Sequence, residues 1–238
     1  MVLGIAVAYT VARGWGTSSD MILGRLPITS SSTLLLAWLV NTPQLLLSTF
    51  YLCINGQCTT VAGAHEWNNL AISRKGLRVT DPRGEQRGTY FLQLPYRWSL
   101  PLAVVSGTLH WLLSQSLFLV RVDYYDRSGT LLSGKDKSKM GCGFSGFSTV
   151  VLCGTLWVLI VATLSIGNMA LKVRVPYAAG CSLVISAACH LPEREREEEV
   201  WLGKVQWGVV EEKMWEDERH CGLSGRAVRK PKVGSKYL

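Results

Sequence analysis

The chain has 238 residues, of which 48% are hydrophobic and 18% are charged, and its formal net charge is +8. Because soluble domains carry about 25% charged residues, this composition argues against an ordinary soluble domain. The Lys and Arg residues lie mainly between uncharged apolar blocks, and the sequence has no RNP-type, zinc-finger or helix-turn-helix pattern. The expected partner is therefore a lipid bilayer with anionic headgroups, and nucleic acid is not expected to bind.

Residues 1–32 predict an apolar N-terminal segment that is too short to span a bilayer, followed by a Gly/Ser/Thr-rich connector. Residues 33–54 contain no charge and are long enough for a first transmembrane helix. Pro43 lies near its middle and predicts a kink, because proline has no backbone N–H. Two half-helices that meet at this proline are the alternative.

A long basic connector is expected at 55–100, and its TYFLQLPYRW stretch is typical of chain lying among lipid headgroups. Further spans are predicted at 101–120, 149–171 and 175–191, because these segments are apolar and uncharged. The last is at the lower limit of spanning length, and its small residues favour close packing on a neighbouring helix or a re-entrant segment. Between the second and third spans, residues 121–148 predict a basic, glycine-rich connector.

Residues 192–238 predict an aqueous C-terminal tail, in which the mixed-charge run EREREEE is typical of a solvated helix face. The connector 121–148 and this tail would share one side of the membrane. They carry more Lys and Arg than the connector 55–100 and the hinge 172–174, so the positive-inside rule favours a cytoplasmic C-terminus. The predicted fold class is an all-α integral membrane helical bundle with about four transmembrane helices.

Several hydrogen-bonding side chains fall within the predicted spans. Five of them are candidates for a polar intramembrane lane: Asn41, Gln44, His110, Ser114 and Gln115. Ionisable residues inside a membrane suggest function by default, so a substrate or proton path is one interpretation. The other is helix packing through interhelical hydrogen bonds of about 1 kcal/mol each. The spans hold no Asp, Glu, Lys or Arg in their cores, which favours packing.

The connector 55–100 also contains Arg83 and Arg87, each followed by a glycine, and both are candidates for contact with a lipid phosphate. Glu66 and Asp81 lie near these arginines in sequence and could form an acid/base site, but a solvated basic loop is the favoured interpretation. HEWNN lacks the second histidine of HExxH, and no GxSxG or P-loop motif occurs. We therefore expect no catalytic residues.

The seven cysteines include no CxxC pair and have no regular spacing, so they do not predict a disulfide framework. Two Cys/His pairs, Cys189–His190 and His220–Cys221, lie at opposite ends of the tail region. Adjacent ligands fit a structural zinc site poorly. Neither a metal nor a cofactor is therefore expected.

Parts of the sequence resemble the C-terminal half of a family of fungal multi-pass membrane proteins of unknown function. The stretches that carry the resemblance are NTPQLLLSTFYLCINGQCTT, EWNNLAISRKGLRVTDPRGEQRGTYFLQLPYRW, LHWLLSQSLFLVRVDYYDRSG, AGCSLVISAACHLPE, VQWGVV and RHCGLSGRAVRKPKVGSKYL. The resemblance implies a helical membrane protein and no particular activity. Family members are usually longer, so the chain looks like a short or truncated member.

The expected function is non-enzymatic: a structural, scaffold or signalling component of a fungal plasma membrane or endomembrane, in contact with lipid and with other membrane helices or protein subunits. The alternative is part of a transporter or channel with a polar lane around His110. A transporter predicts that His110 and Asn41 face one water-filled cavity. A scaffold predicts a dry interface in which these groups bond the backbone or one another.

Overall fold

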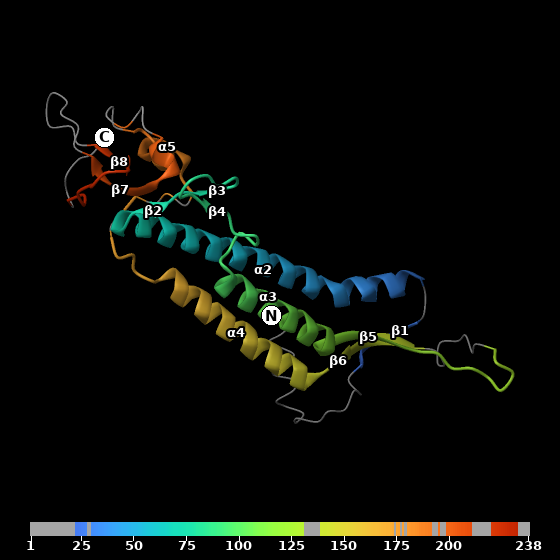
Figure 1. Cartoon of the computed structure of the whole chain (residues 1–238). Coiled ribbons are helices and arrows are strands. Elements are labelled where there is room, and N and C mark those ends of the chain that lie inside the picture. The colour runs from blue at the N-terminus through green and yellow to red at the C-terminus, as the bar shows by residue number, and fades with distance from the viewer. Residues whose placement is uncertain are drawn as a thin grey trace. The chain divides into compact units, whose positions relative to one another are not determined.

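The computed structural model describes residues 22–27, 30–130, 139–173, 175–176, 178, 180–191, 195, 199–210 and 220–232. Figure 1 labels the helices and strands along the chain. In chain order they are β1 (Ile22–Pro27), α2 (Ser30–Ile72), β2 (Lys75–Gly76), β3 (Arg78–Val79), β4 (Arg87–Gly88), α3 (Tyr96–Ser116), β5 (Leu117–Val122), β6 (Lys139–Phe144), α4 (Gly146–Gly167), α5 (Ser182–Ala188), η2 (Val200–Leu202), β7 (Lys204–Val210) and β8 (His220–Ser224).

The prediction of an all-α bundle with about four transmembrane helices is wrong, because the described chain combines helices with three β-sheets. Among the described helices, only α2 and α4 are long and apolar enough to cross a membrane. The polar side chains of α3 lower its mean hydropathy. In the predicted span 175–191, the one helix among the described residues is α5, with seven residues. Its length of about 10 Å is far short of the roughly 30 Å of a hydrocarbon core.

The described residues form two compact units. The first consists of the described residues up to Asn55 together with Leu100–Leu164, and the second consists of Gly56–Ser99 and the described residues from Ser165 onward. Helix α2 contributes to both. It has 43 residues and continues through Pro43, so the two-half-helix alternative does not apply; a helix of this length measures about 65 Å.

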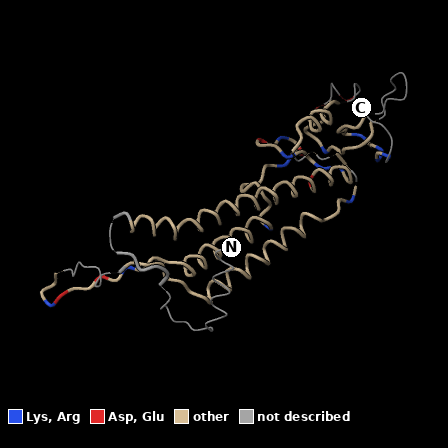
Figure 2. The backbone as a smooth tube through the Cα atoms, turned by 180° about the vertical axis from the view of Figure 1, so that it is seen from behind, with Lys and Arg blue, Asp and Glu red and all other residues tan. Residues whose placement is uncertain are grey.

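The core of the first unit lies where α2, α3 and α4 meet. Leu109, Leu112 and Leu113 of α3 are buried there with Leu47 of α2 and Leu152 of α4. The spacing of the three α3 leucines places them on one helical face. By contrast, α2 and α4 expose large apolar side chains, which include Leu34, Leu35, Trp38, Leu39, Leu45, Leu46, Leu52, Trp157, Val158 and Leu164. Figure 2 shows that long stretches of the three long helices carry no charged residue.

A helix-to-strand change follows α3, where the sequence predicted a span continuing to residue 120. Helix α3 ends at Ser116, and β5 begins at the next residue and pairs with β6 in the antiparallel sheet β1–β6–β5. LFLVRV consists largely of aliphatic, β-branched and aromatic residues that suit a strand. Gly143 of β6 lies under the Phe118 ring, where an added Cβ would overlap the ring.

The second unit has a sheet of order β2–β7–β8 and a parallel pair of short strands, β3–β4. Its core combines residues from α2, α5, β7 and β8, which are Leu70, Ala71, Ala188, Val205, Trp207 and Leu223. Asn68 of α2 is also buried. It donates from Nδ2 to the carbonyl of Val173 at 2.6 Å and accepts from the N–H of Lys172 at 3.2 Å. Val205, Trp207 and Leu223 of this core lie in β7 and β8, which belong to the region predicted as an aqueous tail.

The mixed-charge run EREREEE contains a residue that is not on a solvated face. Glu195 is 2% exposed. It accepts hydrogen bonds from Ser224 Oγ at 2.7 Å and from the N–H of Gly225 at 3.1 Å. The carboxylate is stable there because these donors replace water.

Candidate functional site

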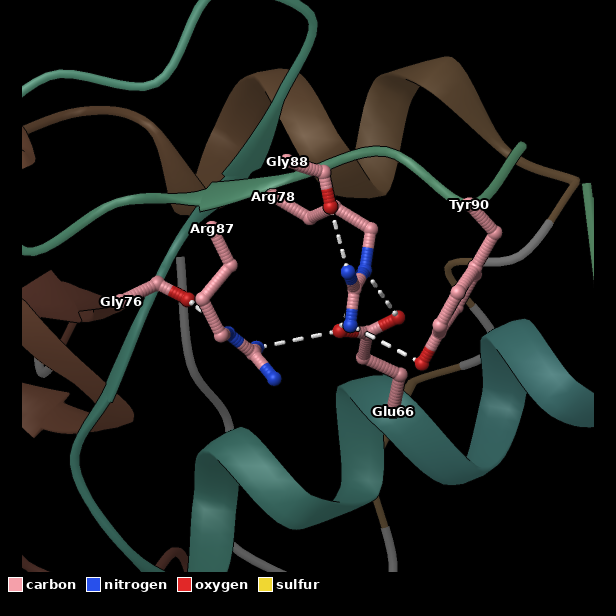
Figure 3. A network of polar contacts seen from close by, with 6 residues as sticks. All are labelled: Glu66, Gly76, Arg78, Arg87, Gly88 and Tyr90. Atoms are coloured by element: carbon pink, nitrogen blue, oxygen red, sulfur yellow. Dashed lines mark hydrogen bonds and ion pairs between the residues drawn. The ribbon is translucent and has the colours of Figure 1, made fainter. Parts of the chain in front are cut away.

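A cluster of charged side chains surrounds Glu66 in the second unit (Figure 3). Arg78 Nε donates to both carboxylate oxygens of Glu66, at 3.1 and 3.3 Å, and Arg87 Nη2 donates to Oε1 at 3.0 Å. Arg78 and Arg87 are direct partners in the parallel pair β3–β4. Both guanidinium groups therefore reach the carboxylate that α2 presents to them.

Further contacts fix the two arginines in place. Arg78 donates from Nη1 to the carbonyl of Gly88 and from Nη2 to Tyr90 Oη at 2.9 Å, and Arg87 Nε donates to the carbonyl of Gly76 at 2.9 Å. The exposed side-chain fractions are 21% for Arg78 and 38% for Arg87. Bonds between ionised partners are about twice as strong as neutral ones, so Glu66 ties the short strands β3 and β4 to helix α2.

The cluster forms one wall of a pocket of about 780 Å³ within the second unit. Two more cations line it: Lys75 in β2 and Arg97 in the first turn of α3. Neither side chain has a hydrogen-bonding or ion-pair partner among the described residues. Of the described residues that line the pocket, Glu66 is the only acid. The resulting positive potential suits an anionic ligand.

The five candidates for a polar lane are only partly brought together. His110 Nδ1 hydrogen-bonds Gln44 Oε1 at 2.7 Å, and Gln44 Nε2 donates to the His110 carbonyl at 3.3 Å. Asn41 and Ser114 are exposed and instead donate to carbonyls of their own helices, at 2.8 and 2.7 Å. Gln115 is exposed on α3. The structure thus joins α2 and α3 through the Gln44–His110 pair.

The two candidates for a lipid-phosphate contact lie in different surroundings. Arg87 lines the pocket. Arg83 is 77% exposed, lies outside the pocket lining and pairs with Asp81 at 3.6 Å. Sequence reasoning missed Lys75 and Arg97 as pocket residues. Only the crowding of arginines after Glu66 signalled a basic site.

The two Cys/His pairs come close together in the fold. The rings of His190 and His220 lie edge to face with centroids 6.3 Å apart. His190 Nδ1 and His220 Nε2 bond the carbonyls of Ser186 and Ala187, at 3.0 and 3.2 Å, and so cap the end of α5. Burial raises the pKa of the Cys221 thiol, which disfavours the thiolate that binds metals. No group of three possible metal ligands occurs among the residues that the structure describes.

A family model described as a domain of unknown function, DUF8419, matches residues 6–227. No curated protein and no solved structure matches the chain. The matched family therefore assigns no activity to the pocket or to the apolar helices.

Proposed function

The chain belongs to the DUF8419 family, and from this premise we propose that it is a membrane-anchored, non-enzymatic component of a fungal membrane, with a structural, scaffold or signalling role. Membership confirms that the chain is part of a family of unknown function. The fungal source and the membrane setting, which the sequence resemblance implied, are part of the proposal. We propose that α2 and α4 contact lipid, and that other membrane helices or protein subunits are further partners.

The exposure of the two apolar helices carries the proposal. Only 11% of the apolar stretch of α2 is buried, and only 6% of that of α4. A core helix of a soluble protein is mostly buried, and soluble monomers rarely expose apolar patches larger than a few hundred Å². Such faces are stable in lipid, because the hydrocarbon chains are as apolar as the exposed side chains and the helical backbone satisfies its own hydrogen bonds.

Hydrogen bonding between α2 and α3 supports a packing role for the polar residues over a transport lane. Gln44 and His110 form hydrogen bonds with each other. Asn41 and Ser114 donate hydrogen bonds to carbonyls of their own helices. A transporter needs polar groups that face water in a shared cavity. The dry-interface arrangement expected for a scaffold matches these contacts better.

Fractionation tests the proposal. After extraction of membranes with alkaline carbonate, the full chain should stay in the pellet. Trp157 of α4 is 67% exposed, and Trp157→Lys combined with Val158→Lys should release a large fraction. A lysine near the middle of a span costs about 3 kcal/mol on insertion scales. Trp201→Lys is the matched control in the second unit and should leave the chain in the pellet. Complete extraction of the unaltered chain by carbonate would refute the proposal.

A further inference from the structure

We propose that the pocket beside Glu66 binds an organic phosphate, with Lys75, Arg87 and Arg97 contacting the phosphate group. The ligand is either an anionic phospholipid, through its headgroup, or a soluble phosphate ester. The recognition chemistry is the same for both sources. The pocket itself does not depend on the proposed membrane role; only the lipid source rests on that role.

The charge balance of the pocket wall points to an anion. Glu66 is already bonded by Arg78 and Arg87, so one carboxylate faces two guanidinium groups. Lys75 and Arg97 then add positive charge with no acidic partner among the described residues. The positive side chains in the pocket repel one another, and a bound dianion offsets that repulsion.

The available donors also fit a phosphate. Arg87 uses Nε for Gly76 and Nη2 for Glu66, which leaves Nη1 with no partner among the described residues. The Lys75 ammonium and the Arg97 guanidinium supply further donors of the kind that binds phosphate. Glu66 is a positioning residue in this arrangement, because it holds the Arg87 side chain at the pocket wall without contacting the ligand.

The size and lining of the pocket indicate more than inorganic phosphate. A volume of about 780 Å³ is in the range that accommodates drug-sized organic molecules. Tyr90, Pro95, Trp98 and Met169 supply apolar and aromatic lining. Trp98 lies in the first turn of α3, and Met169 follows the end of α4 by two residues. Tyr and Trp are enriched where headgroups meet hydrocarbon, which favours an ester with an apolar part.

Calorimetric titration of the purified full chain in dodecyl maltoside micelles tests the proposal. The probes are dihexanoyl phosphatidic acid, glycerol 3-phosphate, and dihexanoyl phosphatidylcholine as the zwitterionic lipid with the same chains. Lys75→Gln combined with Arg97→Gln removes both unpaired cations. Arg83→Gln is the matched control, since it removes one exposed cation of the same loop region outside the pocket. Lys75→Arg with Arg97→Lys keeps both charges.

We expect phosphatidic acid to bind, and the double Gln variant to weaken its affinity by about tenfold or more, since each bond to a charged group contributes at least that factor. Arg83→Gln should change the affinity less than twofold, and the charge-keeping variant should retain most of it. Thermal unfolding and gel filtration check that each variant is folded. Equal weakening by Arg83→Gln, an unaffected double variant, or equally tight binding of phosphatidylcholine would overturn the proposal, as would no binding of either phosphate.

The two phosphate probes separate the sources. Binding of glycerol 3-phosphate as tight as that of phosphatidic acid would identify a soluble ester, and preference for phosphatidic acid would identify the lipid. Either result supports a phosphate pocket. Because this titration is made in micelles and the carbonate test in membranes, failure of one proposal is distinguishable from failure of the other.

Discussion

Gln44 and His110 explain, at the scale of single residues, why apolar helices carry hydrogen-bonding side chains. Each is partly buried and bonds the other across the contact of α2 with α3. An unpaired imidazole or amide in an apolar surrounding costs free energy, so the pair favours one register of the two helices. Neighbouring polar residues that lack such a partner point outward or bond their own helix.

A double-mutant cycle tests this pair. Gln44→Leu and His110→Leu should each lower the free energy of unfolding in detergent by about 1 kcal/mol, and the double variant should lose little more than either alone. Asn41→Leu is the control and should have almost no effect, because Asn41 bonds only its own helix. Strict additivity of the Gln44 and His110 substitutions would show that the two side chains do not interact.

The candidate pocket was only partly predictable at this scale. The arginines after Glu66 indicated an anion contact, and Arg87 does line the pocket. The position of Lys75 was not predictable, because β2, like β3 and β4, has two residues and shows no hydrophobic periodicity. Arg97 lies in the first turn of α3, in a stretch that the sequence assigned to a connector among lipid headgroups. The pairing of β2 with β7, and the contacts of β3 and β4 with α2, join residues that are remote in sequence.

At the scale of elements, hydropathy predicted the two helices whose exposed faces are apolar and failed where helix gives way to strand. An apolar run has the same composition in a helix and in a buried strand, so hydropathy could not predict the boundary at Ser116. Strand β7 was missed although Val205, Trp207 and Val209 are buried at alternate positions, because the period of two was obscured by the flanking charges.

Packing of the β5–β6 pair depends on the absence of a side chain at Gly143. Gly143→Ala should lower the free energy of unfolding by about 1–3 kcal/mol, because the new Cβ displaces the Phe118 ring. Gly107→Ala in α3 is the matched control. Nothing lies near its Cβ position, so it should be neutral or stabilising by up to about 1 kcal/mol. Thermal unfolding in detergent measures both, and an unchanged Gly143→Ala variant would contradict the assigned pairing.

At the scale of the whole molecule, the exposed apolar helix faces and the basic pocket lie in different units. The first unit has uncharged helices whose apolar faces are exposed, and the second has an antiparallel sheet, a parallel strand pair, ion pairs and a basic pocket. The sequence predicted the segregation of charge from apolar blocks. It did not predict that the C-terminal region folds with the end of α2, since buried polar contacts such as those of Asn68 are not encoded in composition.

The most direct test of the central claim is thiol labelling in opened native membranes, with single cysteines at positions 45, 157 and 83 of an otherwise cysteine-free chain. Leu45 and Trp157 are exposed on α2 and α4, and Arg83 is exposed in the second unit. The account predicts that a hydrophilic maleimide labels position 83 readily, and labels 45 and 157 only after detergent is added. Labelling of all three at equal rates in the opened membranes before detergent is added would contradict it, because the apolar faces would then lie in water.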